Sequence, residues 1–338
     1  MDKKLRIGII GAGRISKSHT PALVQRIPQV EVVKLADINL EAAHALADPL
    51  GIPVCRDYHE LIDDPGIDAI FIFSSTDTHA QMCIEAAAAG KHIFCEKPIA
   101  HSLTQIDRAL AAVERAGVKL QIGFNRRFDA NFARVRHAVA SGEIGTPRLM
   151  HIVSRDPAPP PISYVRVSGG MFMDMTIHDF DMARFLIGDE VEEVYTAGAV
   201  MVDPQIGAAG DLDTALIVLR FKNGVIGTID NSRQAAYGYD QRVEILGSRG
   251  SIATANCYPN QAVVSTATEV RQDLPLTFFM DRYTESFASE VRAFVQAVRE
   301  DKPTPVAGVD GLLAVVIALA ARKSYDEHRP VRLDEVSA

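Results

Sequence analysis

The sequence has little cysteine, no long apolar run and no excess of positive charge, and each absence excludes a class of protein. Its four cysteines, Cys55, Cys83, Cys95 and Cys257, are scattered without C-x-x-C spacing, which argues against a disulfide framework or zinc knuckle and favours a reducing cytoplasm. No apolar run reaches the ~18–20 residues that a membrane-spanning helix needs, and the first residues show no signal-peptide pattern. The net charge of −8 argues against nucleic acid and anionic membranes as partners.

The chain is long enough for two domains with separate cores, since it has 338 residues, 47% of them hydrophobic. Residues 1–124 alternate short apolar runs with helical segments rich in Ala and Leu. The runs predict strands at Leu5–Ile10, Val30–Ala36, Ile67–Phe73, Lys91–Cys95 and Lys119–Phe124, with helices at Glu41–Asp48, His79–Ala89 and Ser102–Ala116. Apolar strands alternating with helices predict an α/β domain whose parallel sheet is covered on both faces.

The pattern changes after Gly123 and predicts a second domain. Strands are expected at Arg148–Arg155, Glu192–Val200, Thr214–Phe221, Val225–Asp230, Arg242–Leu246 and Ala262–Ser265, with helices at Phe132–Ala140, Tyr283–Arg299 and Gly311–Ser324. Asn223-Gly224 between two of the strands is a strong hairpin signal. Because these strands follow one another without helical crossovers, we expect an α+β domain with an open antiparallel sheet. The expected domains are therefore 1–124 and 125–338.

A glycine-rich turn follows the first predicted strand and opens a helix. It reads Gly8-Ile9-Ile10-Gly11-Ala12-Gly13-Arg14-Ile15-Ser16. The glycines let the backbone turn tightly and approach a pyrophosphate at the helix N-terminus. Asp37 ends the second predicted strand, where a carboxylate accepts a hydrogen bond from a ribose 2′-hydroxyl and repels a 2′-phosphate. The pattern predicts an NAD site; the alternatives are a glycine turn without a ligand and a helix-capping acid.

Two further segments follow predicted strands, at the sheet edge where open parallel sheets bind ligands. After Ile67–Phe73 come Ser74, Ser75, Thr76 and His79. Their small hydroxyl groups let a cofactor pass closely, or simply cap the next helix. Lys97 follows Lys91–Cys95, within Glu96-Lys97-Pro98. A lysine there stabilises the charge that develops on a substrate oxygen as hydride leaves, although a loop lysine is usually only solvated.

Asp174 and His178 lie four residues apart in the segment Gly169–Asp181, which is expected to enter a helix. That spacing puts both side chains on one helix face. A histidine accepts a hydroxyl proton near neutral pH, and an aspartate can orient it or a nearby lysine. The alternatives are an acid placed near the helix start for the dipole and an interior histidine. No third ligand accompanies the pair, so no metal site is expected.

Together these pieces resemble the glucose–fructose oxidoreductase/inositol dehydrogenase (Gfo/Idh/MocA) family over essentially the whole chain. The resemblance is carried by Gly8–Ser16 with His19, Ser75–His79, Glu96-Lys97-Pro98, Gly123–Phe128, and Asp174 with His178. Glu-Lys-Pro after a strand is the most specific single motif. Within the family, Gly123–Asp129, Ser154–Pro157 and Ser168–Asp181 look most like inositol 2-dehydrogenases. Ser16 departs from the third glycine of the cofactor fingerprint.

The resemblance implies an N-terminal Rossmann domain and a C-terminal α+β domain with an open, mainly antiparallel sheet, often assembled as a homotetramer. It implies that Lys97 and His178 are catalytic, supported by Asp174, and that Glu96 contacts the nicotinamide half of NAD. The Lys97–Pro98 bond is expected to be cis. The polyol substrate is expected to meet Lys97, Arg127, Asp156, Asp174, His178 and Tyr239. The cofactor is expected to meet Gly11, Gly13, Arg14, Ile15, Asp37, Ser74, Ser75, Thr76, His79, Glu96 and Lys97.

The expected activity is that of an NAD-dependent inositol 2-dehydrogenase, which converts myo-inositol to 2-keto-myo-inositol (scyllo-inosose). One alternative is a family dehydrogenase for scyllo-inositol, D-chiro-inositol or an aldose, because the stereochemistry of one hydroxyl is read by geometry rather than by residue type. Another is a non-catalytic NAD(P)-sensing regulatory protein on the same fold. The presence of Lys97, Asp174 and His178 argues against the regulatory alternative.

Overall fold

The computed structural model describes residues 4–336 of the chain. By their internal contacts these residues form two compact units. The first unit holds the described residues up to Phe128 together with Glu285–Val315, and the second holds Asp129–Thr284 together with the described residues from Val316 onward. The chain therefore returns to its first unit after building most of the second. The division into two continuous domains, 1–124 and 125–338, stays a prediction.

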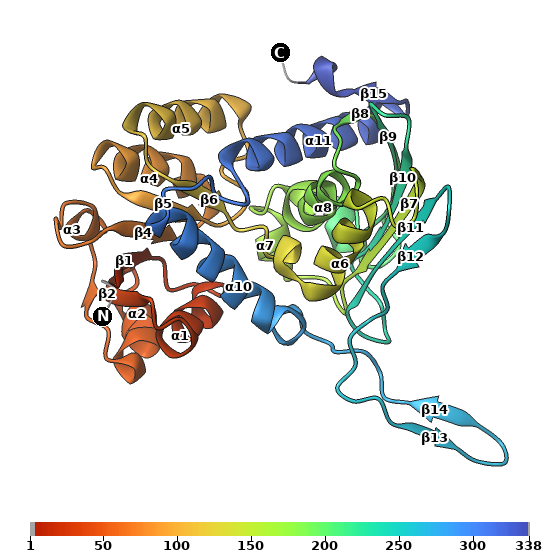
Figure 1. Cartoon of the computed structure of the whole chain (residues 1–338), viewed down its shortest axis with the longest axis horizontal. Coiled ribbons are helices and arrows are strands. Elements are labelled where there is room, and N and C mark those ends of the chain that lie inside the picture. Colours follow the sequence, from red (N-terminus) through yellow and green to blue (C-terminus); the bar gives the residue numbers. More distant parts are fainter. Residues whose placement is uncertain (1–3, 337–338) are drawn as a thin grey trace. The chain divides into compact units, whose positions relative to one another are not determined.

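The first unit is built around a six-stranded, wholly parallel sheet with the strand order β3-β2-β1-β4-β5-β6; β1, β2, β4, β5 and β6 are labelled in Figure 1. Its strands are β1 (Leu5–Ile10), β2 (Val30–Ala36), β3 (Val54–Cys55), β4 (Ala69–Ile72), β5 (His92–Cys95) and β6 (Leu120–Ile122). Its helices include α1 (Ser16–Arg26), α2 (Leu40–Ala47), α3 (His59–Ile62), α4 (Thr76–Ala88) and α5 (Leu103–Ala116), with 3-10 turns at Asp48–Leu50 and Asn125–Phe128. The predicted parallel sheet is confirmed.

Helices cover both faces of this sheet, which explains why its strands are apolar along their whole length. One face packs against α1, α2 and the later part of α10 (Phe279–Arg299). The rings of Phe71 and Phe94 stack with centroids 5.0 Å apart, and Phe294 of α10 meets them edge-on at 5.5 and 5.9 Å. A helix from late in the sequence thus completes the first core. On the other face, α4 packs beside α5.

The second unit contains a seven-stranded sheet with the order β12-β11-β7-β10-β9-β8-β15. Its strands are β7 (Pro147–Arg155), β8 (Val191–Ala199), β9 (Thr214–Phe221), β10 (Ile226–Ser232), β11 (Asp240–Gly247), β12 (Ser251–Ala253) and β15 (Val331–Arg332); β13 (Val263–Ser265) and β14 (Val270–Gln272) form a separate hairpin. The helical segments are α6 (Ala130–Ala140), α7 (Ile162–Val165), a π-helical segment (Phe172–Thr176), α8 (Ile177–Ile187), α9 (Pro204–Ala208), part of α11 (Gly308–Glu327) and a 3-10 turn (Leu333–Glu335).

One pair of strands in the second sheet departs from the expected antiparallel arrangement. β7 and β10 run parallel, from Leu149 beside Ile226 to Arg155 beside Ser232. The hairpin at Asn223-Gly224 makes β10 antiparallel to β9, and β10 pairs on its other side with β7, a strand distant in sequence. Gly224 supplies the positive φ, +87°, that this turn needs. The open, mainly antiparallel sheet is confirmed, but the expectation of antiparallel pairing is wrong for β7 and β10.

The second sheet has one buried face and one exposed face. Along β9, Ala215, Ile217, Leu219 and Phe221 are buried, whereas Leu216 is 50% exposed. The strand register places further exposed apolar side chains on the same face as Leu216, namely Leu149, Tyr195, Ile226 and Leu246. Exposed apolar side chains spread over five adjoining strands form an unusual surface for a monomer.

All four cysteines are free thiols, of which Cys55, Cys83 and Cys95 are buried and Cys257 is half-buried. Burial, with the adjacent Cys83, raises the pKa of Cys95 well above the ordinary thiol value. Burial and the nearby Glu60 raise the pKa of Cys55 to about 11. Within residues 4–336, no helix combines the length and hydropathy that crossing a bilayer requires.

A network of charged side chains lies on the exposed face of the second sheet. Arg155 donates to Asp230 and, from Nη1, to the Tyr237 hydroxyl at 3.0 Å. Tyr237 and Arg242 both donate to Asp240, the arginine at 2.7 and 2.9 Å. Burial of Asp240 opposes its ionisation, but hydrogen bonds from Arg242, Tyr237 and Asn256 outweigh burial and lower its pKa to about 2. The folded chain therefore holds Asp240 as a carboxylate in moderately acidic solution.

This pKa predicts how stability changes in acid. The folded pKa of Asp240, about 2, lies below the ordinary value of about 3.9. Its contribution to the free energy of unfolding is therefore complete above about pH 4 and is lost as the pH falls towards 2, at a slope of at most about 1.4 kcal/mol per pH unit. Urea unfolding across this range should show a flatter pH dependence for Asp240→Asn than for wild type. The exposed Asp107→Asn is the control, and equal slopes for wild type and Asp240→Asn would contradict the prediction.

Candidate active site

The glycine-rich turn has the geometry of a site that a phosphate can approach. Gly11 follows β1 with φ at +106°, and a Cβ there would lie 2.6 Å from the carbonyl carbon of Phe73, so only glycine fits. A Cβ on Gly13 would meet nothing closer than 4.0 Å, and Gly13 and Arg14 are exposed. Ser16, the departure from the fingerprint, is buried and its hydroxyl pairs with Thr20 at 3.0 Å. The serine therefore fits the helix packing.

The Asp37 carboxylate is held at this turn by two backbone N–H groups. Ala12 N donates to Oδ2 at 2.6 Å and Asn39 N donates to Oδ1 at 2.7 Å. Asp37 does not cap α2, since the oxygen of Asn39 accepts from Ala42 N and fills that role. The remaining lone pairs of a half-buried carboxylate beside the glycine turn suit a pair of ribose hydroxyls.

The loop after β4 lies at the same carboxyl edge of the sheet. The Ser74 hydroxyl pairs with that of Thr78 at 2.7 Å, and Ser75 makes no side-chain capping bond to α4, so capping does not account for Ser75. His79 is buried, and its ring nitrogens lie 2.8 Å from the Pro98 carbonyl oxygen and 3.1 Å from that of Ser74. His79 therefore links this loop to the Glu96-Lys97-Pro98 segment.

Lys97 follows β5 at that edge and is the one half-buried residue between Ile93 and Ala100. The Lys97–Pro98 peptide bond is cis, as expected. The preceding Glu96 is buried, with one carboxylate oxygen 3.3 Å from Nε2 of His19 and the other 3.3 Å from the backbone N of Lys97. His19 in turn stacks on Phe73 with ring centroids 4.7 Å apart. These contacts fix the backbone from which the lysine side chain extends.

Arg127 is held within the first unit. Its Nη2 lies 2.9 Å from Oδ1 of Asp310, and Nη1 donates to the Pro305 carbonyl at 3.5 Å. The guanidinium is thus oriented by an acid from the first turn of α11, a partner that the sequence does not reveal. Its expected contact with a substrate stays a prediction.

In the second unit, Asp174 and His178 stand out by their exposure. From Met171 to Arg184 every residue is buried except these two, which are half-buried. That the two side chains share one face of the helix stays a prediction. The helix differs from the expectation in one respect: Asp174 lies in a π-helical turn, Phe172–Thr176, and His178 in α8. Such turns are frequent at functional sites.

The Asp174 carboxylate is held on both oxygens. The Tyr164 hydroxyl donates to Oδ1 at 2.9 Å, and Nη1 of Arg233 donates to Oδ2 at 3.2 Å. Arg233 is only 1% exposed and directly follows β10. Sequence patterns indicate neither partner, since Tyr164 and Arg233 lie 10 and 59 residues from Asp174 and both contacts depend on the tertiary fold. The alternative of an acid placed for the helix dipole does not explain these contacts.

Asp156 and Tyr239 lie at the sheet edge that also carries Arg233. Asp156 N donates to the Ser232 carbonyl at 2.9 Å, and Ala235 N donates to the Asp156 carbonyl at 2.7 Å. Tyr239 is nearly buried, and its ring meets Tyr283 edge-on with centroids 6.1 Å apart. Tyr239 directly precedes β11, whose first residue pairs with Arg155. The second unit thus gathers Asp156, Asp174, Arg233 and Tyr239 through described contacts.

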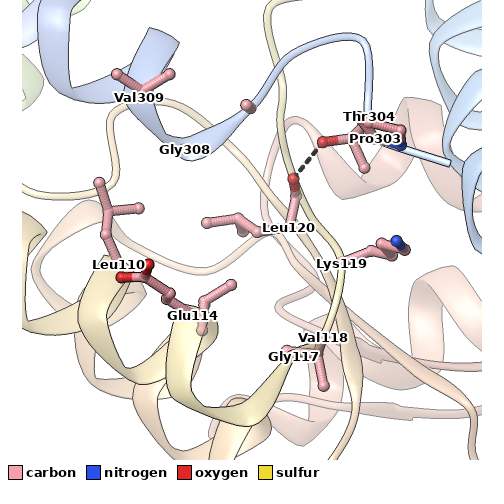
Figure 2. Close-up of a pocket in the computed structure, with 12 residues that line it drawn as sticks. Leu110, Glu114, Gly117, Val118, Lys119, Leu120, Pro303, Thr304, Gly308 and Val309 are labelled. Carbon is pink, nitrogen blue, oxygen red and sulfur yellow. Dashed lines mark hydrogen bonds between the residues drawn. The ribbon is translucent and has the colours of Figure 1, made fainter. Parts of the chain in front are cut away.

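A groove of about 460 Å³ elsewhere in the first unit is not the cofactor site (Figure 2). It is lined by Leu110, Val113, Glu114, Gly117, Val118, Lys119, Leu120, Pro303, Thr304, Ala307, Gly308 and Val309. It lies where α5 ends and β6 begins, at the amino edge of the parallel sheet, opposite the edge that carries Gly11 and Lys97. Across residues 4–336, no cluster of three His, Cys, Asp or Glu side chains suits a metal ion.

Comparison with known proteins agrees with this geometry. Residues 5–124 match the model of the oxidoreductase family with an NAD-binding Rossmann fold, and residues 132–253 match the GFO/IDH/MocA C-terminal domain. The chain is 51% identical over 335 residues to an uncharacterized oxidoreductase, YrbE, of Bacillus subtilis, covering 99% of this chain and 98% of that protein. It is 47% identical over 333 residues to a myo-inositol 2-dehydrogenase of Thermotoga maritima, covering 98% of this chain and 99% of that enzyme.

A solved structure extends the comparison to three dimensions. The scyllo-inositol dehydrogenase from Lactobacillus casei, with bound NAD(H) and scyllo-inositol, is similar with a TM-score of 0.92 and 29% identity. The alignment covers 98% of this chain and all of that one. The resemblance inferred from the motifs is confirmed, and this chain belongs to the Gfo/Idh/MocA family of oxidoreductases, with an NAD-binding Rossmann fold in its amino-terminal part.

Proposed function

We propose that this chain is an NAD-dependent inositol 2-dehydrogenase that oxidises myo-inositol to 2-keto-myo-inositol (scyllo-inosose). The pair Asp174 and His178 carries this proposal, because these two polar side chains are half-buried in an otherwise buried stretch of helix from Met171 to Arg184. The inositol dehydrogenases among the relatives support the substrate class. Three buried, free cysteines support action in a reducing cytoplasm.

NAD would be held by the carboxyl edge of the first sheet. Gly11, Gly13, Arg14 and Ile15 would meet the pyrophosphate at the start of α1, and Asp37 would accept from the ribose, which favours NAD over NADP. The loop Ser74–Thr76, shaped by His79, and the buried Glu96 would line the path to the nicotinamide half. When bound, NAD supplies the hydride acceptor.

The chain's own side chains would handle the proton and the charge. His178 in its neutral form accepts the proton of the reacting hydroxyl, and the Lys97 ammonium stabilises the negative charge that develops on that oxygen. Asp174 would keep His178 in place. Arg127, Asp156 and Tyr239 would contact the other hydroxyls, since a ring of adjacent hydroxyls needs several directional partners.

The substrate assignment is tested by NADH formation with a panel of myo-inositol, scyllo-inositol, D-chiro-inositol and aldoses. We expect myo-inositol to give the highest kcat/KM, and Lys97→Met to reduce turnover by about 10²–10⁴, typical of a lost charge-stabilising group. NADH binding, followed by fluorescence, should change much less. The exposed Lys222→Met is the control. If no polyol yields NADH although NADH binds, the chain is a regulatory protein instead.

The role of His178 predicts a pH dependence. Only the neutral imidazole accepts a proton, so kcat/KM for oxidation should fall as the pH drops through the pKa of His178, whose ordinary value is about 6.5. His178→Ala should lose most activity and most of the acidic limb. A His178→Gln variant with wild-type turnover and the same acidic limb would show that His178 only positions the substrate.

We further propose that the exposed face of the second sheet packs against another copy of the chain, most simply in a homotetramer. Light scattering at micromolar concentration should report a multiple of the 36.7 kDa chain mass. Leu216→Lys, in the centre of that face, should shift the particles to smaller mass, because a charge there loses its water on assembly. The comparably exposed Leu40→Lys in α2 is the control. Wild-type particles of one chain mass would refute the assembly.

A further inference from the structure

Among the fully buried side chains of the described structure, that of Arg233 is the largest, and it ends in a guanidinium cation. A buried cation requires carboxylate partners, because an unpaired charge in the interior is very costly. Arg233 has two of them: Nη1 lies 3.2 Å from Oδ2 of Asp174, and Nη2 lies 3.8 Å from Oδ2 of the buried Asp211. One cation thus stands between two acids, one of which is the candidate catalytic aspartate.

Asp211 connects this cation to the start of the helix that carries Asp174 and His178. Its Oδ1 accepts from the backbone N of Met171 at 3.1 Å. A Cβ on Gly170 would lie 2.8 Å from the same oxygen, and φ at Gly170 is +80°. Only glycine therefore lets the helix start come this close to Asp211. The guanidinium of Arg233 therefore pairs with the Asp174 side chain and with Asp211, which binds the first turn of the helix.

The backbone of Arg233 is fixed as well. Its N–H donates to the Asp213 carbonyl at 2.8 Å. The Asp213 carboxylate accepts from the backbone N of Met201, Val202 and Asp203 at 2.7, 2.9 and 3.0 Å. These bonds outweigh burial and lower the pKa of Asp213. The arginine is therefore anchored at its backbone before its side chain reaches the helix.

We propose that Arg233, with Asp211, is a positioning residue for the reaction: it holds the Asp174 carboxylate in the one orientation from which Asp174 supports His178. The proposal rests on the catalytic role given to Asp174 above. Tyr164 fixes one oxygen of Asp174 and Arg233 fixes the other, so the plane of the carboxylate is set. A planar guanidinium can serve two acids at once, whereas the single ammonium of a lysine reaches only one of them at full strength.

The test compares Arg233→Met and Arg233→Lys with a matched control. Arg184→Met removes another nearly buried arginine, from α8, which pairs with Glu190 at 2.7 and 2.8 Å. We expect Arg233→Met to lower kcat by about 10²-fold, the size of effect that misplacing a reacting group produces, with NADH binding close to wild type. Arg233→Lys should recover part of that loss. Arg184→Met should keep kcat close to wild type.

A double-mutant cycle with Asp174→Asn separates positioning from general support of the fold. If Arg233 acts through Asp174, adding Arg233→Lys to Asp174→Asn should lower kcat little further, because both changes disrupt the same Arg233–Asp174 contact. Fully additive losses would overturn the proposal, as would wild-type kcat in folded Arg233→Met or, where that variant does not fold, in Arg233→Lys. If Asp174→Asn itself keeps wild-type kcat, the catalytic role of Asp174 fails first. Loss in Asp174→Asn without loss at Arg233 refutes only the positioning role.

Discussion

Parallel strand pairing is the constraint that decides where the polar side chains of this chain lie. In the first sheet every pair is parallel, so β1, β2, β4 and β5 end at one edge and bring Gly11, Asp37, Ser74 and Lys97 to it. The second sheet reaches a similar result with one parallel pair. Because β7 and β10 run the same way, Asp156 and Arg233 follow strands that end side by side. An antiparallel β7 and β10 would have put these residues at opposite edges of the sheet.

At both of these sheet edges, charged groups must also be kept ordered where little water remains. The chain does this by giving each carboxylate more than one partner. Glu96 faces His19 and the backbone N–H of Lys97, and Asp174 meets Tyr164 and Arg233. Desolvation makes such contacts stronger than they would be at the surface. It also makes a buried charged group without a partner correspondingly costly in free energy. These carboxylate side chains are therefore ordered before any ligand binds.

The sequence predicts much of the fold because its local patterns are strong. Leu5–Ile10, Val30–Ala36 and Thr214–Phe221 are found as strands with the predicted bounds. β3 and β15 have two residues each, too few to show a periodicity, and the parallel pairing of β7 with β10 depends on a neighbour distant in sequence. The spacing of Asp174 and His178 predicts that they share a helix face. Tyr164 and Arg233, which bind Asp174, and Asp211, which pairs with Arg233, are brought in by tertiary contacts that no local pattern encodes.

The distribution of thiols has a practical consequence for observing this protein. A thiol reacts with labelling reagents as its thiolate and where reagent can reach it, which disfavours the buried Cys55, Cys83 and Cys95 and leaves Cys257. The Cys257 carbonyl accepts from Leu276 N at 2.9 Å, and the Leu276 carbonyl accepts from Tyr239 N at 3.0 Å. The unaltered chain thus carries its own attachment point for a fluorophore, two hydrogen bonds from a candidate substrate contact.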